Sequence, residues 1–348
     1  MKRKIQIYNH YIGDECPCFI VAEIGNNHQG NFELAVKLIE KAKEVGVDAV
    51  KFQKRDINSL LTKHLYNSPY DGPNSFGKTY GEHREKVELS VEDFAKLKKI
   101  AEDMDILFFA SVWDEISLDQ MINIGVEIIK IPSADLVNIP LIRKAAGYKK
   151  VIFLSTGMSS LDEIDIAVSE LNKRGSNYVL LHCNSSYPCP YEEIALPAIK
   201  QLRERYSCLV GYSGHEIGIY PSLASICYGA CVIEKHFTLD KNLPGSDHCV
   251  SLTPDEMKKL VEGIRIIEKS IIVKEKKVFN REYESSKKLR KSIVASRDIK
   301  KGEILSENNI TVKSPGTGLS PIYWDYVIGK KAKKNYLKDD FILLDEIE

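Results

Sequence analysis

The sequence has no net charge, no long apolar run and no ordered spacing of its cysteines. Its 49 Lys and Arg residues balance 49 Asp and Glu residues, so bulk electrostatics predicts neither a nucleic-acid partner nor an anionic membrane surface. No apolar stretch approaches the roughly 20 residues of a membrane-spanning helix, and no signal-peptide apolar segment follows the basic residues at the N-terminus. The eight cysteines are scattered without CxxC spacing, which favours reduced thiols and a cytoplasmic location.

The chain alternates β-type runs with helical patterns. In residues 31–46 the apolar side chains recur at helical spacing, and residues 160–175 begin with Ser160 and Glu163 at the positions of a capping box. The β-type runs cover residues 18–25, 48–53, 106–111, 127–132, 150–156, 178–183, 208–213 and 231–237.

Eight strands that alternate with helices predict an α/β protein with a parallel sheet, and the number eight favours a closed (β/α)8 barrel of the TIM type. An open doubly wound sheet is the alternative. No G-x-G-x-x-G follows the first predicted strand, which weighs against a dinucleotide-binding version of that sheet.

Two segments depart from this alternation. Residues 54–90 are too long for an ordinary connection and rich in Gly, Pro and Asn, as lids and binding loops are. After residue 271 the composition becomes rich in Lys, Arg, Glu and Ser. We therefore predict a barrel domain over residues 1–271, a solvated linker over 272–291 and a small domain of short strands over 292–348, with a helical patch near 321–328.

Polar side chains lie where the predicted strands end, which in such a barrel is the catalytic mouth. A lone lysine or histidine at such a place often has a structural role, and residues 184–187 alone could be a turn. Polar or charged residues at the ends of seven strands are hard to explain by structural roles alone. These candidates are Glu23, Lys51, Gln53, Ser111, Lys130, Ser133, Asp135, Asn184, Ser185, Tyr187, Ser213, His215, Glu234, His236 and Asp247.

The residue types indicate the chemistry. His215 and His236 end successive strands and could bind one divalent metal that keeps positions open for substrate. Lysines, hydroxyls and an amide suit a phosphate and a carboxylate. A Schiff-base lysine, Lys51 or Lys130, would instead give a metal-independent aldolase; the two histidines argue against it without excluding it.

Several motifs together resemble the sialic acid synthase family. They are AEIGNNHQG, VKFQKRD, GKTYGEH, CNSSYPCP, GYSGHEIG, EKHFTLDKNLPGSDH and the C-terminal VKSPGTGLSP, spread over essentially the whole chain. The resemblance implies a TIM barrel followed by an antifreeze-protein-like (SAF) domain, in a domain-swapped homodimer. It also implies condensation of phosphoenolpyruvate with an N-acetylmannosamine-type sugar and water, which gives N-acetylneuraminate and phosphate by C–O cleavage.

The resemblance also implies residue roles. His215 and His236 would hold Mn²⁺ or Mg²⁺, and Glu23 would orient water or act as a base; we count these three and Asp135 as catalytic. Gln53, Asp247 and Tyr80 would face the sugar. The phosphoenolpyruvate site would comprise Lys51, Lys130, Ser133, Asn184, Ser185, Tyr187 and Ser213, with Ser111 as a further substrate-binding candidate.

One position departs from the family pattern. Many bacterial relatives carry an arginine that reaches the partner's sugar, where this chain has Ser314. The sugar could thus be N-acetylmannosamine, its 6-phosphate or a 2,4-diacetamido-6-deoxy hexose, the last giving legionaminic or pseudaminic acid. A carbohydrate-binding protein without turnover is the alternative outside enzymes.

The stretch VIEKHFTL (232–239) places three ionisable residues inside a predicted buried strand. Because neighbours in a strand alternate faces, Glu234 should share the side of His236 and meet a lysine or the metal. Lys235 should point to the helix layer, in a structural role.

Overall fold

The structure, a computed structural model, describes residues 3–348. The chain divides into two compact units, Met1–Ile272 and Val273–Glu348. The first unit comprises the predicted barrel and the second begins within the predicted linker.

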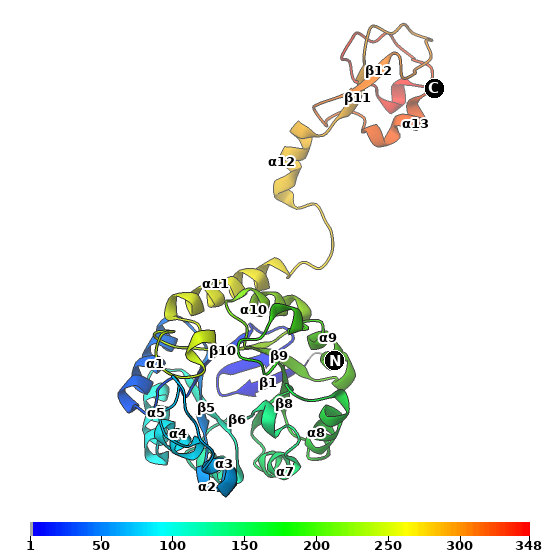
Figure 1. The fold of residues 1–348 in the computed structure, drawn as a ribbon. Helices are drawn as coiled ribbons and strands as arrows, with labels where there is room; N and C mark the ends of the chain where they lie inside the picture. The colour runs from blue at the N-terminus through cyan, green and yellow to red at the C-terminus, as the bar shows by residue number, and fades with distance from the viewer. Residues whose placement is uncertain (1–2) are drawn as a thin grey trace. The chain divides into compact units, whose positions relative to one another are not determined.

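The first unit is a closed barrel of eight parallel strands, as the alternation predicts, so the open sheet is excluded (Figure 1). Consecutive strands are neighbours, and β10 closes the barrel against β3. The strands are β3 (Phe19–Gly25), β4 (Ala49–Lys54), β5 (Leu107–Val112), β6 (Ile128–Ile131), β7 (Val151–Ser155), β8 (Tyr178–His182), β9 (Leu209–Gly214) and β10 (Val232–His236).

Helices surround the strands and bury one apolar side each against them (Figure 1). The predicted capping box is present at the start of α8, where Ser160 and Glu163 satisfy each other's backbone N–H groups. The outer helices are α1 (Phe32–Glu44), α5 (Val91–Asp103), α6 (Glu115–Asn123), α7 (Ile139–Gly147), α8 (Leu161–Lys173), α9 (Ala198–Tyr206), α10 (Tyr220–Ser225) and α11 (Pro254–Ser270).

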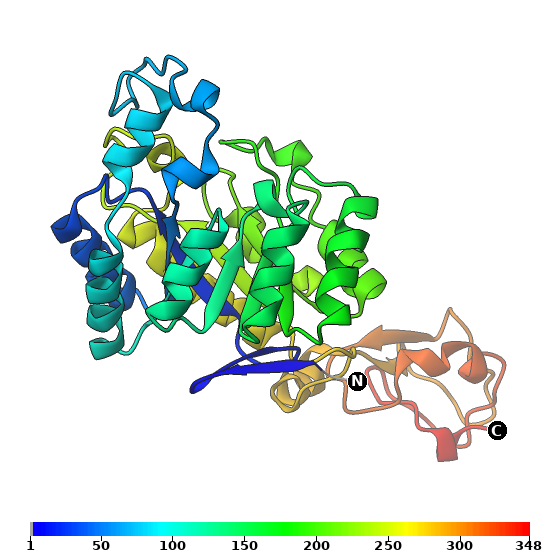
Figure 2. The ribbon, with the colours of Figure 1, turned by 90° about the horizontal axis from the view of Figure 1, so that it is seen from below.

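A short hairpin precedes the barrel and was not predicted from the sequence. Strands β1 (Lys4–Ile7) and β2 (His10–Gly13) pair antiparallel. Ile7 and Ile12 belong to the apolar cluster of the barrel interior that includes Phe19 and Phe153. Figure 2 shows the hairpin at one end of the barrel and α2–α4 at the other. The hairpin therefore covers the end of the barrel away from the mouth.

The long segment after β4 forms three short helices, α2 (Ile57–Leu60), α3 (Lys63–Tyr66) and α4 (Tyr80–Val87). We call residues 54–90 the lid. Tyr70 lies against Tyr80 and His83, at ring-centroid distances of 5.5 and 4.5 Å. The lid therefore has a small aromatic core of its own.

The second unit has its own core around Tyr336 and Ile293. Strands β11 (Ser292–Ala295) and β12 (Ile310–Lys313) pair antiparallel, and α13 (Trp324–Val327) falls in the predicted helical patch. The predicted linker is not wholly irregular, because it contains α12 (Asn280–Leu289). This helix buries none of its residues, and Tyr283 and Leu289 are its only large apolar side chains, too few to predict a helix from the sequence.

Two further features bear on the expectations from composition. All eight cysteines are free. Within residues 3–348, no helix is both long enough and apolar enough to cross a bilayer.

Candidate functional site

The mouth of the barrel holds a cavity of about 190 Å³. Every barrel strand, or the residues directly after it, contributes to its lining. Strand register explains the convergence: Glu23 lies opposite Lys51, and Ser111 lies opposite both Gln53 and Lys130. The predicted candidates that line it are Glu23, Lys51, Gln53, Ser111, Lys130, Ser133, Ser185, Tyr187, Ser213, His215, Glu234 and His236.

An apolar layer lies beneath this polar layer, two residues earlier along the strands. Side chains two apart on a strand share a face, and the barrel interior changes from Val21 to Glu23, from Phe109 to Ser111 and from Phe153 to Ser155. Because the apolar layer fills the barrel below, the charged groups of the mouth face only the cavity and one another. Their charges are thus removed from bulk water.

Lys51 is the centre of the charge network. Its side chain is buried, and Nζ lies 2.8 Å from Glu23 Oε2, 3.4 Å from Glu234 Oε1 and 2.8 Å from Ser111 Oγ. Burial by itself lowers the pKa of Lys51, but the two carboxylates outweigh it and hold that pKa above its ordinary value. Lys51 is therefore a charged amine whose charge is balanced by the two glutamates, and it holds both of them in position.

Lys130 is buried as deeply but is paired differently. Its Nζ donates to Ser155 Oγ at 2.7 Å and to the Ile131 carbonyl at 3.3 Å. In the described part of the chain, no carboxylate lies within ion-pair distance of it. Burial lowers the pKa of Lys130 despite the more distant Glu234. A buried cation without a direct counter-ion costs several kcal/mol, and an anionic ligand in the cavity would remove that cost.

The three ionisable residues of β10 have the predicted orientations. Glu234 turns inward, where Ser213 Oγ donates to it at 3.1 Å, and although burial opposes ionisation, Lys51 and Lys130 lower its pKa. Lys235 points outward and is paired with the fully buried Glu216 at 3.1 Å. Glu216 accepts in turn from Ser222 of α10, so Lys235 is structural.

The two histidines lie side by side, with ring centroids 5.6 Å apart. His215 Nδ1 lies 2.5 Å from the Asn184 carbonyl. A carbonyl only accepts, so Nδ1 carries the proton and the Nε2 lone pair is available, here to the Tyr187 hydroxyl at 2.9 Å. Burial, with a contribution from His236, lowers the pKa of His215 to about 3. The ring is therefore neutral.

The surroundings of His215 are typical of a metal ligand, whereas those of His236 are less complete. A ligating imidazole usually donates its other N–H to a carbonyl or carboxylate, as His215 does. His236 Nδ1 is buried without a hydrogen-bond partner among the described residues, and it lies 3.8 Å from Asp247 Oδ2. No set of three or more His, Cys, Asp or Glu side chains within residues 3–348 is arranged around one point as a metal site. Water or substrate would have to complete the coordination of a metal bound here.

Four predicted site residues do not line this cavity. Tyr80 lies on the lid, where its hydroxyl accepts from Arg84 Nε at 3.0 Å. Asp247 stands beside His236, and Asp135 accepts from Asn138 at 2.9 Å. A catalytic role for Asp135 stays a prediction that this geometry does not favour.

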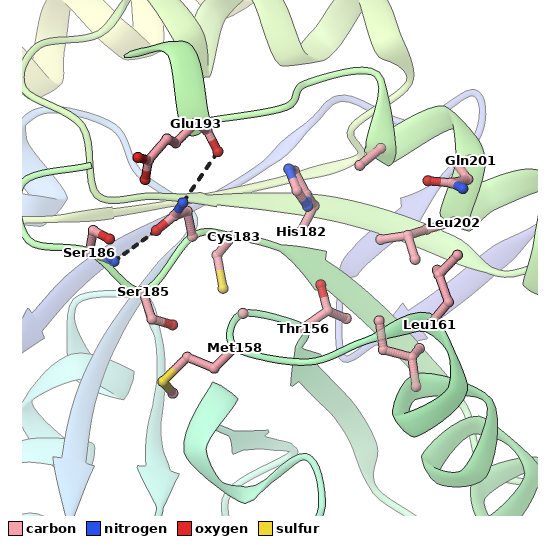
Figure 3. A pocket seen from close by; sticks show the side chains of 14 residues that line it. Thr156, Met158, Leu161, His182, Cys183, Ser185, Ser186, Glu193, Gln201 and Leu202 are labelled. Atoms are coloured by element: carbon pink, nitrogen blue, oxygen red, sulfur yellow. Dashed lines mark hydrogen bonds between the residues drawn. The ribbon is translucent and has the colours of Figure 1, made fainter. Parts of the chain in front are cut away.

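Asn184 is the fourth and lines a neighbouring pocket of about 390 Å³. Figure 3 shows this pocket, with Thr156, Leu161 and Leu202 among its other lining residues. Its amide donates to the Glu193 carbonyl at 3.2 Å and accepts from the Ser186 N–H at 2.9 Å. Ser185, Cys183 and Met158 line both this pocket and the cavity at the mouth. The two hollows thus share a wall.

Sequence reasoning missed Ser155, Trp113 and Cys183, which also line the cavity. Ser155 is the last residue of β7 and could have been found by the strand-end rule. Gly157 also matters, since an added Cβ would lie 2.8 Å from Ser133 Oγ and 3.0 Å from Cys183 Sγ. Only glycine lets the backbone approach these side chains.

The fold and this site define a TIM-barrel protein whose mouth is lined by lysines, glutamates, histidines and hydroxyl groups, joined to a small second domain. Residues 38–276 match the NeuB family and residues 290–348 match the SAF domain. The chain therefore belongs to the NeuB family, the sialic acid synthase family, as the sequence motifs predict.

Three similar proteins illustrate the relationship. The N,N'-diacetyllegionaminic acid synthase of Campylobacter jejuni is 42% identical, over 93% of this chain and 98% of the relative. The human N-acetylneuraminate-9-phosphate synthase is 36% identical, over 96% and 93%. The crystal structure of N-acetylneuraminic acid synthetase from Leptospira borgpetersenii, in complex with citrate, has 35% identity and a TM-score of 0.73, covering 82% of this chain and 95% of that one.

The unpaired Lys130 generates a prediction for anion binding. Sulfate should raise the melting temperature of the wild type. At about 100 times its Kd, it should add on the order of 2–3 kcal/mol to the free energy of unfolding. Because the anion favours the charged amine and burial has lowered the pKa of Lys130, the effect should fade as the pH becomes alkaline. Thermal unfolding in sulfate and in chloride at equal ionic strength measures it.

Lys130→Met should lose this sulfate effect. The control is Lys150→Met, because Lys150 precedes β7 and pairs with Glu127 at 2.6 Å, away from the cavity. An equal sulfate effect in wild type and Lys130→Met would contradict the assignment of Lys130 as the anion-binding cation.

Proposed function

We propose that this protein is a sialic acid synthase. It condenses phosphoenolpyruvate with N-acetylmannosamine, or a close relative, and water to give N-acetylneuraminate and phosphate. The similarity to an N,N'-diacetyllegionaminic acid synthase and an N-acetylneuraminate-9-phosphate synthase supports the reaction class. The observation that carries the proposal is the buried Lys130, whose Nζ donates to Ser155 and forms no ion pair with a carboxylate of residues 3–348.

The charge distribution suggests where phosphoenolpyruvate lies. Lys51 already contacts two carboxylates, whereas Lys130 forms no ion pair with any carboxylate of residues 3–348 and has the hydroxyls of Ser155 and Ser133 on its side of the cavity. The phosphate or carboxylate of phosphoenolpyruvate would lie on Lys130, and the glutamates would repel it from the opposite wall. Its C3 would face the open mouth, from which the sugar would arrive.

The proposed reaction forms one carbon–carbon bond and replaces the C2–O bond to phosphate by a C2–O bond to water. C3 of phosphoenolpyruvate attacks the aldehyde carbon of the open-chain sugar, the aldehyde oxygen takes up a proton from solvent and becomes a hydroxyl, and C2 becomes electron-deficient. Water adds to C2 and gives up a proton to Glu23, whose carboxylate lies 2.8 Å from Lys51 Nζ. The tetrahedral intermediate then expels phosphate together with its bridging oxygen, leaving the 2-keto acid.

His215 and His236 would hold a divalent cation, Mn²⁺ or Mg²⁺. When bound, such an ion supplies Lewis-acid polarisation of the aldehyde oxygen. The chain's own contribution is to keep the His215 imidazole neutral and oriented through the Asn184 carbonyl, and to bury both rings.

A panel of sugars tests the function and its substrate. With phosphoenolpyruvate present, phosphate release should be fastest with N-acetylmannosamine, compared with its 6-phosphate and with 2,4-diacetamido-6-deoxy hexoses. A faster reaction with one of the others would move the protein to the 9-phosphate or the legionaminic or pseudaminic acid synthases. Release with none of them would contradict the proposal and favour a carbohydrate-binding protein without turnover.

Removal of divalent metal tests the histidine pair. EDTA should abolish phosphate release, added Mn²⁺ should restore it, and His236→Ala should not be restored. Melting temperatures report whether that variant is folded. Activity that survives EDTA and does not respond to Mn²⁺ would overturn the metal assignment.

Isotope labelling tests the bond that breaks. With ¹⁸O in the bridging position of phosphoenolpyruvate, C–O cleavage should deliver the label to phosphate, as mass spectrometry of the products would show. Label in the keto acid would mean P–O cleavage and would contradict the addition of water at C2.

Other expectations stay predictions, because nothing in the described residues tests them. They are the domain-swapped homodimer, the cytoplasmic location and the effect of Ser314 on sugar recognition.

A further inference from the structure

Arg55 is a buried cation beside the cavity that no part of the proposed reaction uses. It directly follows β4 and is 4% exposed. Its guanidinium lies over the Trp113 ring, 4.3 Å from the ring centroid, and donates to Gln53 Oε1. Gln53 and Trp113 line the cavity, and Arg55 does not. Arg55 therefore reaches the cavity wall through its contacts with these two side chains.

Gln53 connects Arg55 to the charge network. Its Nε2 donates to Glu23 Oε1 at 2.8 Å, and Glu23 is in turn 2.8 Å from Lys51. A carboxylate only accepts and a guanidinium only donates. Glu23 and Arg55 therefore bind opposite ends of the same amide, and a flipped amide would have an unfavourable contact at both ends.

Arg55 is itself held firmly in place. Trp113 supports one face of the guanidinium, and Nη1 lies 3.5 Å from Glu88 Oε1, just after α4 at the end of the lid. Burial, with a smaller effect of nearby Arg84, lowers the pKa of Arg55 to about 10, so it remains charged at neutral pH. A planar donor fork stacked on an aromatic ring is a role that lysine does not fill.

We propose that Arg55 is a positioning residue that fixes the orientation of the Gln53 amide and, through it, the Glu23 carboxylate. This inference rests on the proposed function, in which Glu23 receives a proton and Gln53 faces the sugar. Loss of Arg55 frees the Gln53 amide to rotate. The Glu23 carboxylate then loses the N–H donor that fixes its orientation.

Lys54 offers a matched control, because it separates this role from an ion pair with the lid. Lys54 is also buried and also binds Glu88, at 3.0 Å, but it makes no contact with Gln53. Removal of either cation disturbs Glu88, whereas only removal of Arg55 disturbs the amide.

Steady-state kinetics with phosphoenolpyruvate and the best sugar of the panel test the role. Arg55→Met should lower kcat/KM for the sugar by about 10- to 100-fold, with the KM for phosphoenolpyruvate unchanged. Arg55→Lys should not rescue the activity. Lys54→Met should retain the wild-type kinetics, and melting temperatures should show that all three variants are folded.

A double variant gives the decisive comparison. In a Gln53→Ala background, Arg55→Met should cause no further loss, because residues that act as one unit are not additive. The inference would be overturned if the losses in kcat/KM of the two single variants multiplied in the double variant. Equal losses in Arg55→Met and Lys54→Met would also overturn it.

A crystal structure of Arg55→Met separates this inference from the proposed function. An inactive wild type would defeat the proposed function, yet the structure would still test Arg55. Gln53 Nε2 should move away from Glu23 Oε1, and an unchanged 2.8 Å contact would overturn the positioning role.

Discussion

The site depends on the burial of two lysines with unequal partners at the barrel mouth. Lys51 holds both Glu23 and Glu234 within ion-pair distance, whereas Lys130 has only hydroxyl and carbonyl oxygens in contact. Because the charges lie above an apolar layer, bulk water does not screen this difference. The mouth therefore has a negative wall, where water is activated in our account, and a positive wall, where an anion binds.

Strand alternation is the constraint that makes this arrangement possible. In β10 a single residue step separates Glu234, which belongs to the site, from Lys235, which is paired with Glu216 beneath α10. The same rule places the polar mouth two residues beyond the apolar layer on several strands. A shift of one residue in register would bury the site charges among the helices.

The barrel and most of the site were predictable because both follow from repeated, local patterns. Apolar runs, caps and strand ends are properties of neighbouring residues, and the family motifs added specificity. The hairpin β1–β2 was missed because its two four-residue strands are too short to show a period.

The site residues that the structure places elsewhere follow strands rather than lie in them. Asn184 lies in an irregular segment and Asp135 in a one-turn 3-10 helix, and their side chains turn to nearby partners, the Glu193 carbonyl and Asn138. Sequence position fixes where such a residue is but not which way it points. The contact of Arg55 with Gln53 could not be predicted from the sequence either. Arg55 is held in place by stacking on the ring of Trp113, which follows a different strand.

A crystal structure of the wild type with phosphoenolpyruvate tests the central claim most directly. The account predicts a phosphate or carboxylate group within hydrogen-bonding distance of both Lys130 Nζ and Ser155 Oγ, with Lys51 still bound to Glu23 and Glu234. Phosphoenolpyruvate bound only in the neighbouring pocket beside Asn184, with Lys130 free of any anion, would contradict it.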